Sequence, residues 1–326
     1  MVRFLLFFVP IVALSIYPFL DHPPIFVFKD GFVTLDFEGR HPEPLFMAVK
    51  TERDEFVLID QPSKRHKIRI PVTENFEYRL KIGSVERSGR IALPSSEMDE
   101  ATVLIFGDSR GNNEVLKRIV EMGKGSDFLM FLGDVAFSDF YDEDWRDFFE
   151  SLSEFGGVVF TVRGNHEIPG LRYSEYLYPE SYSFKIGKVN FLAVNHKFLA
   201  SVDSEIEKLY SPGYFNVLVV HQPVVSCTEG TPAVDEELLD SLRKRGMSLV
   251  ISSHDHNYQR VKTDGVLQLI FGGGGAPIYE VNEDCRGLER YYEGYSFALM
   301  KVKRDRILFE VFDLSGNLLD SFEVGM

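Results

Sequence analysis

The stretch LIFGDSRGNNE, residues 104–114, changes character in its middle. An apolar run ends in Gly107-Asp108, and Arg110 follows two residues later. A short apolar run bounded by turn residues is typical of a buried strand. In α/β sheets, functional groups gather just beyond the carboxyl ends of the strands. Asp108 is therefore a candidate site residue, and Arg110 beside it needs an explanation of its own.

Four more apolar runs end in polar residues of the types that bind metals. They are FLGD (131–134), VRGNHE (162–167), VVHQP (219–223) and ISSHDH (251–256). If these runs are strands of one α/β core, their ends meet at one edge. We expect the following side chains to converge there: Asp108, Asp134, Asn165, His166, His221, His254 and His256.

The residue types in this set indicate the chemistry of the site. Carboxylates, an amide oxygen and imidazoles, with no thiolate, suit zinc, manganese, iron or cobalt. Three strong donors satisfy one ion, so six indicate two ions that share a carboxylate. Such a pair lowers the pKa of a bound water and clamps phosphate oxygens, which is the chemistry of phosphate-ester hydrolysis.

The pattern between these motifs predicts an α/β domain. From Ala101 onward, strand-like runs alternate with helical segments expected over about 113–122, 143–154 and 235–245. The tail is different. Its runs at 267–271, 296–302, 306–312 and 318–324 look like strands joined by tight turns. For them we expect a mainly antiparallel second sheet.

The N-terminal third of the chain divides into two parts. In residues 24–93, short alternating segments are separated by Gly, Pro and charged turns, which predicts six or seven strands in a small β sandwich. We therefore expect a β domain over 21–95 and a catalytic domain over 99–326. Residues 1–20 carry one arginine before an apolar run and resemble a secretory signal. Alternatively, residues 4–20 remain as a membrane anchor; either way, we expect an extracytoplasmic protein.

Composition limits the partners and leaves the cysteines open. The net charge of −15 argues against binding a nucleic-acid duplex, which needs a basic face. Hydrophobic residues make up 44% of the chain, enough for a large core. The only two cysteines, Cys227 and Cys285, either form one disulfide in an oxidising compartment or remain separate thiols.

The order GD, GD, GNHE, VVHQP and SHDHNYQR resembles the calcineurin-like metallophosphoesterase superfamily, and within it most resembles the purple acid phosphatases. The supporting blocks are GDVAFSDFYDEDW (133–145), YPESYSFKIGKVNFLAVN (178–195), LQLIFGGGGAP (267–277) and YSFALMKV (295–302). This resemblance implies a four-layer αββα sandwich. The preceding β segment is similar to the fibronectin type III-like domain found before the catalytic domain in that group.

The resemblance also implies a role for each motif residue. Asp134 would bridge two metal ions, with Asp108 and His256 on the first. Asn165, His221 and His254 would hold the second ion. His166 would position phosphate or protonate the leaving group. Glu167, the next residue, would either orient that imidazole or face solvent.

Two positions depart from the family pattern. Arg110 stands where many superfamily members have a metal-binding histidine, and Phe137 stands where purple acid phosphatases have a tyrosine ligand. Asp139 and Tyr141 are candidates to complete the shell of the first metal. Arg110 would either contact a phosphate oxygen or pair with an acidic residue such as Asp139 or Asp142.

The expected activity is hydrolysis of a phosphomonoester by a metal-bound hydroxide, with His166 assisting departure. The partner would be a phosphate-ester small molecule or a phosphorylated substrate. One alternative is a phosphodiesterase or nucleotide hydrolase with the same centre. Another is a catalytically weak exported binding protein that retains the fold.

Overall fold

The computed structural model describes residues 22–29, 31–178, 180–195, 202–230 and 233–326. The expected signal or anchor at 1–20 lies outside these residues, so export and membrane anchoring remain predictions. Within the described part of the chain, no helix is both long enough and apolar enough to cross a membrane.

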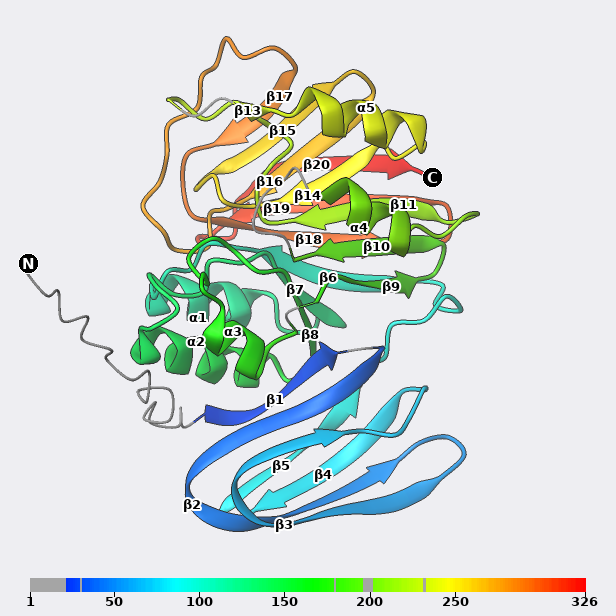
Figure 1. The fold of residues 1–326 in the computed structure, drawn as a ribbon, viewed down its shortest axis with the longest axis vertical. Coiled ribbons are helices and arrows are strands. Elements are labelled where there is room, and N and C mark those ends of the chain that lie inside the picture. Colours follow the sequence, from blue (N-terminus) through cyan, green and yellow to red (C-terminus); the bar gives the residue numbers. More distant parts are fainter. Residues whose placement is uncertain (1–21, 30, 179, 196–201, 231–232) are drawn as a thin grey trace, which may run out of the picture.

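Two large sheets pack face to face and enclose the main core (Figure 1). The first sheet runs in the order β20 (Leu318–Gly325), β19 (Arg306–Asp313), β18 (Ser296–Val302), β6 (Ala101–Phe106), β7 (Phe128–Phe131), β8 (Val158–Thr161), β1 (His22–Lys29), β2 (Phe32–Lys50), β4 (Phe76–Ile82) and β5 (Val85–Ile91), with β3 (Glu55–Arg69) paired to β2. The second runs β17 (Leu288–Tyr292), β15 (Tyr258–Thr263), β16 (Val266–Phe271), β14 (Leu249–Ser252), β11 (Phe215–Val220), β10 (Val189–Val194) and β9 (Tyr182–Ile186). A short hairpin joins β12 (Val225–Ser226) to β13 (Ala233–Val234).

Helices cover the outer faces of both sheets. On the first sheet lie α1 (Asn113–Met122), α2 (Asp142–Phe155) and α3 (Leu171–Tyr176), whose apolar side chains form a second core with β6 and β7. On the second sheet, α4 (Val202–Leu209) and α5 (Glu236–Lys244) form a third core with β10 and β11. The expected αββα sandwich is confirmed, and α1 has the bounds that the sequence predicts.

The parallel strands at the centre of each sheet place the site. β6, β7 and β8 pair in parallel, as do β10, β11, β14 and β16. Their side chains are almost all buried because both faces of each strand are covered. All these strands therefore present their carboxyl ends, with the polar motifs that follow them, at one edge of the sandwich.

The tail does not form the expected second sheet. β18, β19 and β20 are antiparallel, as predicted, but β18 pairs with β6 and so extends the first sheet. β16 instead lies parallel to β14 in the second sheet. The run of turns correctly indicated hairpins. It could not indicate that β18 covers the edge of β6, whose backbone groups would otherwise be unpaired.

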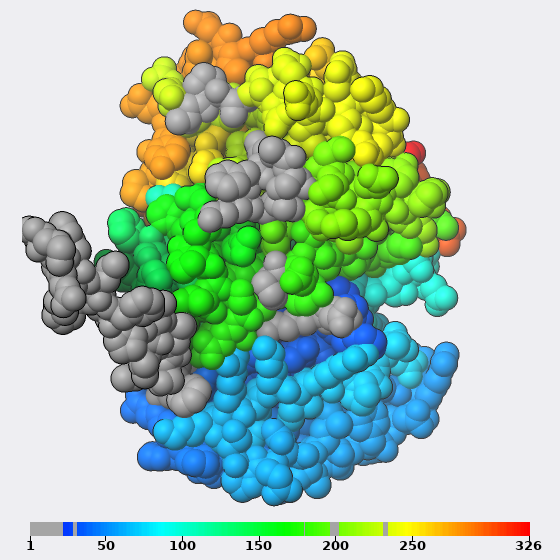
Figure 2. All heavy atoms as spheres, in the orientation of Figure 1, coloured from blue at the N-terminus to red at the C-terminus, as the bar shows by residue number. Residues whose placement is uncertain are grey.

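The N-terminal strands form one strongly bent unit at one end of the molecule (Figure 1), which is coloured in shades of blue in Figure 2. This part is all-β, as expected, but it has five strands because β2 continues from 32 to 50 through register shifts near Glu38 and Glu43. The first half of β2 pairs with β1 and the second half with β4, while β3 follows its other side. β1 also pairs in parallel with β8, so this unit continues the first sheet. That residues 21–95 form an independent domain remains a prediction.

Polar contacts, some of them buried, connect this N-terminal unit to α3. The Arg65 guanidinium lies 2.6 Å from the Glu175 carboxylate and donates to the Glu175 carbonyl at 2.8 Å. The Tyr176 hydroxyl donates to Glu38, a carboxylate that is 1% exposed, at 2.9 Å. Because Glu38 and Arg65 lie on β2 and β3, the first strands of the chain fix the position of a helix beside the site.

Cys227 and Cys285 form a disulfide, with their Cα atoms 5.6 Å apart. This settles the open alternative in favour of pairing. The bond joins the residue after β12 to the segment before β17, and so ties together two loops above the second sheet.

Removing the disulfide with the double substitution Cys227→Ser/Cys285→Ser should lower the free energy of unfolding by about 2–4 kcal/mol. The reason is that the bond closes a loop of sequence separation 58 in the unfolded chain. Calorimetry should show a Tm several degrees lower for the variant, and a reducing agent should lower only the Tm of the parent. An identical Tm for the two proteins would contradict this expectation.

Candidate metal centre

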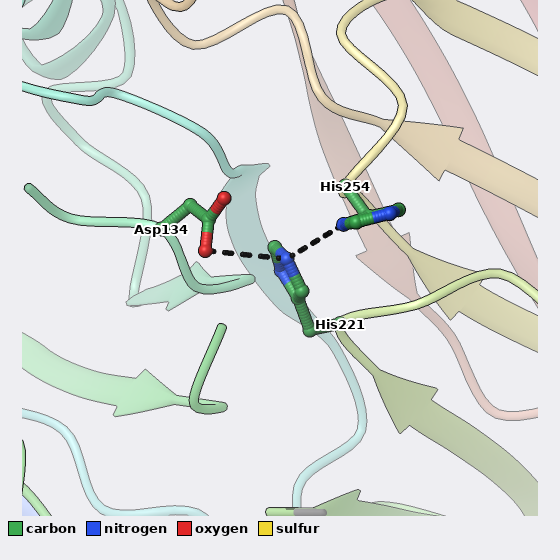
Figure 3. Close-up of side chains that lie close together, drawn as sticks. All are labelled: Asp134, His221 and His254. Atoms are coloured by element: carbon green, nitrogen blue, oxygen red, sulfur yellow. Dashed lines mark hydrogen bonds and ion pairs between the residues drawn. The ribbon is translucent and has the colours of Figure 1, made fainter. Parts of the chain in front are cut away.

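Four donor atoms meet where β7, β8, β11 and β14 end. Figure 3 shows three of the side chains, with Asp134 and His254 on either side of His221. His221 Nε2 lies 3.3 Å from Asp134 Oδ1 and 3.3 Å from His254 Nδ1. Asn165 Oδ1 lies 3.1 Å from His221 Nε2 and 2.8 Å from His254 Nδ1. Ligands about 2.1 Å from one ion are separated by about 3.0–3.4 Å, so these atoms fit the shell of a single metal.

A backbone carbonyl fixes the orientation of the His221 imidazole. Its Nδ1 lies 2.8 Å from the carbonyl oxygen of Leu132 and therefore carries the proton that it donates there. Nε2 is left with a lone pair directed at the other donors, which is the usual arrangement of a metal-binding histidine. His256 is arranged in the same way, with Nδ1 donating to the Pro277 carbonyl at 2.7 Å.

A second donor group shares Asp134 with the first. The ligand atoms of Asp108, Asp134 and His256 all lie within 4.8 Å of one another, and all three side chains are buried. Asp108 Oδ1 and His256 Nε2, 3.6 Å apart, have no hydrogen-bond partner. Buried polar atoms without partners are rare and costly. A cation between them would satisfy both, so the residues present fit two metal ions with Asp134 common to both.

Backbone strain is concentrated at this centre. Among the described residues, five that are not glycine have positive φ, and four of them are Asp108 (61°), Arg110 (41°), Asp134 (57°) and His254 (70°). Side chains rarely adopt this left-handed conformation, and each such residue is maintained only when its surroundings require it. The turns after β6, β7 and β14 are therefore shaped to direct these side chains inward.

Glu167 holds the turn that carries Asp134. Its carboxylate accepts hydrogen bonds from the backbone amides of Asp134 (2.9 Å), Val135 (2.7 Å) and Gly164 (2.8 Å). The side chain is completely buried, so the expected solvent-facing position is wrong. The expected role of orienting His166 is also wrong, because the Glu167 carboxylate binds backbone amides and the His166 imidazole binds the Phe137 carbonyl. Burial, and then the charge of Asp134, raise the pKa of Glu167 to about 8. No motif spacing distinguishes this role; only the folded loop reveals it.

Gly164 is required because the loop lies against Asp134. A Cβ atom at this position would come within 2.1 Å of Asp134 Oδ1. The glycine of the GNHE motif thus allows the loop that carries Asn165 to approach the carboxylate closely.

His166 lies at the solvent side of the centre. Its Nδ1 donates to the Phe137 carbonyl at 2.5 Å, and its Nε2 lies 3.9 Å from Asp134 Oδ2. The side chain is 22% exposed. It is therefore near the metal group without belonging to either set of three donors.

Arg110 pairs with the shared carboxylate. Its Nη2 and Nε lie 3.0 and 3.3 Å from Asp134 Oδ2. The expected alternative of a pair with Asp139 or Asp142 is wrong, because Arg172 binds Asp142 and backbone amides at the start of α3 bind Asp139. Contact with phosphate remains a prediction. At 15% exposure, Arg110 can reach both the centre and solvent.

The two candidates to complete the first metal's shell have other roles. Asp139 accepts from the amides of Leu171 at 2.6 Å and Arg172 at 3.3 Å, which caps α3. Tyr141 is 53% exposed, and its ring contacts that of Phe137. Neither residue belongs to the two donor groups.

Burial and charge set the protonation states that metal binding needs. Burial lowers the pKa of both His254 and His256 to about 4, assisted by His221 and Arg110 respectively. Both imidazoles are neutral at pH 7 and able to bind a metal. Burial opposes ionisation of Asp134, but His221, the His166 amide and Arg110 outweigh it and lower the pKa to about 2. Burial, followed by the Asp134 charge, raises the pKa of Asp108.

Residues 101–258 match the family model described as calcineurin-like phosphoesterase. This stretch of the chain is therefore similar to the calcineurin-like phosphoesterase family, as the motif order predicts. It is also similar to purple acid phosphatase 7 of Arabidopsis thaliana, with 30% identity over 128 residues. That alignment covers 37% of this chain and 38% of the relative's length, so it reports on part of each protein.

Solved structures support the fold over a longer stretch. The purple acid phosphatase PPD1 from yellow lupin (Lupinus luteus) seeds matches 93% of this chain and 74% of its own with a TM-score of 0.74 at 14% identity. PhoD matches 95% of this chain and 93% of its own with a TM-score of 0.64 at 11% identity. GAP50, the anchor in the inner membrane complex of Plasmodium, matches 70% of this chain and 89% of its own with a TM-score of 0.58 at 14% identity. At these identities the likeness establishes the architecture, and the site has to be judged on its own residues.

Glu167→Ala should weaken binding of Mn²⁺ or Zn²⁺ by about 10- to 100-fold, because the turn that directs Asp134 loses its support. Glu97→Ala, at an exposed position between β5 and β6, provides the matched control. Titration calorimetry on protein stripped with a chelator measures both variants. Equal affinities for Glu167→Ala and the parent, with folding retained, would contradict the proposed role of Glu167.

Proposed function

We propose that this protein hydrolyses phosphate esters, with phosphomonoesters as its natural substrates, at a centre of two metal ions. The observation that carries the proposal is the sharing of Asp134 between two donor groups. Such a carboxylate is what two ions about 3.5–4 Å apart require. The metals suited to mixed oxygen and nitrogen donors are iron, zinc, manganese and cobalt. The family match supports the reaction class.

In the proposed reaction, each part of the site has a distinct task. Asp108 and His256 would hold one ion, Asn165, His221 and His254 would hold the other, and Asp134 would be common to both. The two ions, when bound, supply an activated water and positive charge for the phosphate oxygens.

His166 and Arg110 act on the substrate. His166 Nε2 faces the centre from the solvent side, so it is placed to donate a proton to the departing oxygen. Arg110 has two nitrogen atoms directed at the centre, so it can bind a phosphate oxygen once the ions neutralise Asp134.

Export of the protein also belongs to this proposal. A disulfide persists in oxidising compartments, and the bond between Cys227 and Cys285 fits the extracytoplasmic location that residues 1–20 predict. The substrate would then be a phosphate ester that is available outside the cytoplasm.

Asp134→Ala should lower kcat/KM for a nitrophenyl phosphate monoester by on the order of 10³-fold, because both ions lose a common ligand. The assay uses metal-loaded protein, with the corresponding bis(nitrophenyl) diester in parallel. Faster turnover of the diester would favour the phosphodiesterase alternative. Full activity in the variant would contradict the two-ion centre, and folded, metal-loaded parent protein without turnover would favour a binding protein.

Arg110→Ala should lower kcat/KM by about 10- to 100-fold, the effect of losing a charge-assisted hydrogen bond to phosphate. Arg110→Lys should recover only part of this loss because lysine cannot make the two-pronged contact. Arg118→Ala, an exposed position on α1, is the control. An unchanged kcat/KM for Arg110→Ala would contradict a contact with phosphate. The role of Arg110 would then be to compensate the charge of Asp134.

A further inference from the structure

Exposed aromatic side chains gather beside the metal centre. Among the residues that the structure describes, eleven large hydrophobic side chains are exposed, and Phe137 (59%), Phe140 (47%) and Tyr141 (53%) occupy a single loop. The Phe137 ring lies 5.9 Å from the His166 ring and 5.8 Å from the Tyr141 ring, measured between centroids. We call Phe137 and Tyr141 the aromatic rim.

The position of the aromatic rim is fixed by its backbone. The amide of Phe137 donates to Asp144 at 2.8 Å, and its carbonyl accepts from His166. Tyr141 precedes the first residue of α2, and its amide donates to the Ser138 carbonyl at 3.0 Å. The two rings contact each other edge to face. A preorganised surface of this kind binds a ligand without the cost of ordering a loop.

The exposure of the rim has no evident structural benefit. Leaving a phenylalanine in water forgoes about 1.5–3 kcal/mol relative to burying it. Elsewhere this chain buries large aromatic side chains such as Trp145, Phe148 and Phe149 of the following helix. Exposed apolar groups beside convergent polar ones are characteristic of ligand sites.

Charge around the rim narrows the class of ligand. The segment 137–144, FSDFYDED, contains four acidic residues and no basic one. Arg172 pairs with Asp142, and backbone amides bind Asp139 and Asp144, so part of this negative charge is compensated. The segment still offers no basic side chain to a substrate whose organic part carries further negative charge, such as a nucleoside polyphosphate. An uncharged planar group would instead contact the rings.

We propose that the aromatic rim binds the organic part of the substrate, and that the protein therefore prefers phosphate esters of uncharged aromatic alcohols. This inference rests on the proposed function. His166 faces the centre next to Phe137, so a leaving group that takes a proton from His166 lies against the Phe137 ring. Phe137 thus determines specificity from its position beside His166.

The test compares inhibitors that differ only in their organic group, which removes the effect of leaving-group reactivity. Phenylphosphonate and methylphosphonate are titrated as competitive inhibitors of the metal-loaded protein, and their direct binding is measured by calorimetry. Phe137→Ala and Tyr141→Ala should each raise the Ki of phenylphosphonate by about 3- to 10-fold and change that of methylphosphonate by less than about 2-fold. Phe46→Ala, an exposed phenylalanine on β2, is the matched control and should change neither.

The outcomes separate this inference from the proposed function. In one outcome, the parent protein hydrolyses esters while Phe137→Ala and Tyr141→Ala lose affinity equally for both phosphonates, or for neither. That result would overturn the aromatic preference and leave the phosphatase proposal intact. No hydrolysis of any ester, together with no binding of either phosphonate, would overturn both.

Discussion

Asp134 holds a negative charge in a place that solvent does not reach, and much of the surrounding structure serves to stabilise that charge. Its side chain is fully buried, and its backbone has the positive φ of the left-handed region. Three backbone amides around its turn donate hydrogen bonds to the Glu167 carboxylate. A buried carboxylate without compensation costs several kcal/mol. Arg110 and the backbone amide of His166 supply part of the compensation, and two divalent ions would supply the rest.

The sandwich explains why this arrangement can be rigid. Each donor follows a strand that is packed on both faces, so the strand ends cannot move independently of the core. The N-terminal unit extends this support. Arg65 and Glu38 hold α3, Asp139 holds the start of α3, and the Asp139 amide donates to the His166 carbonyl. A strand near the start of the chain is thereby connected to the loop that carries His166.

The sequence was sufficient for the parts of the fold and site that depend on local pattern. The helix at 113–122 follows from the alternation of strand-like and helical segments. The convergence of the six candidate donor side chains follows from apolar runs that end in polar residues. The pairing of β18 with β6 and of β1 with β8 depends on which strand edges are free, and no local pattern encodes that. The role of Glu167 cannot be predicted from the sequence for the same reason, since its partners are backbone amides of a turn 32 and 33 residues away. The sequence also cannot indicate the partner of Arg110. Arg172 pairs with Asp142 and amides of α3 bind Asp139, so Arg110 pairs with Asp134 instead.

Anomalous diffraction from crystals of the manganese-loaded protein tests most directly whether two ions share Asp134. If they do, we expect two anomalous peaks about 3.5–4 Å apart, with Asp134 between them, Asn165, His221 and His254 around one, and Asp108 and His256 around the other. A single peak at full metal loading, or two peaks that do not both contact Asp134, would contradict the shared carboxylate.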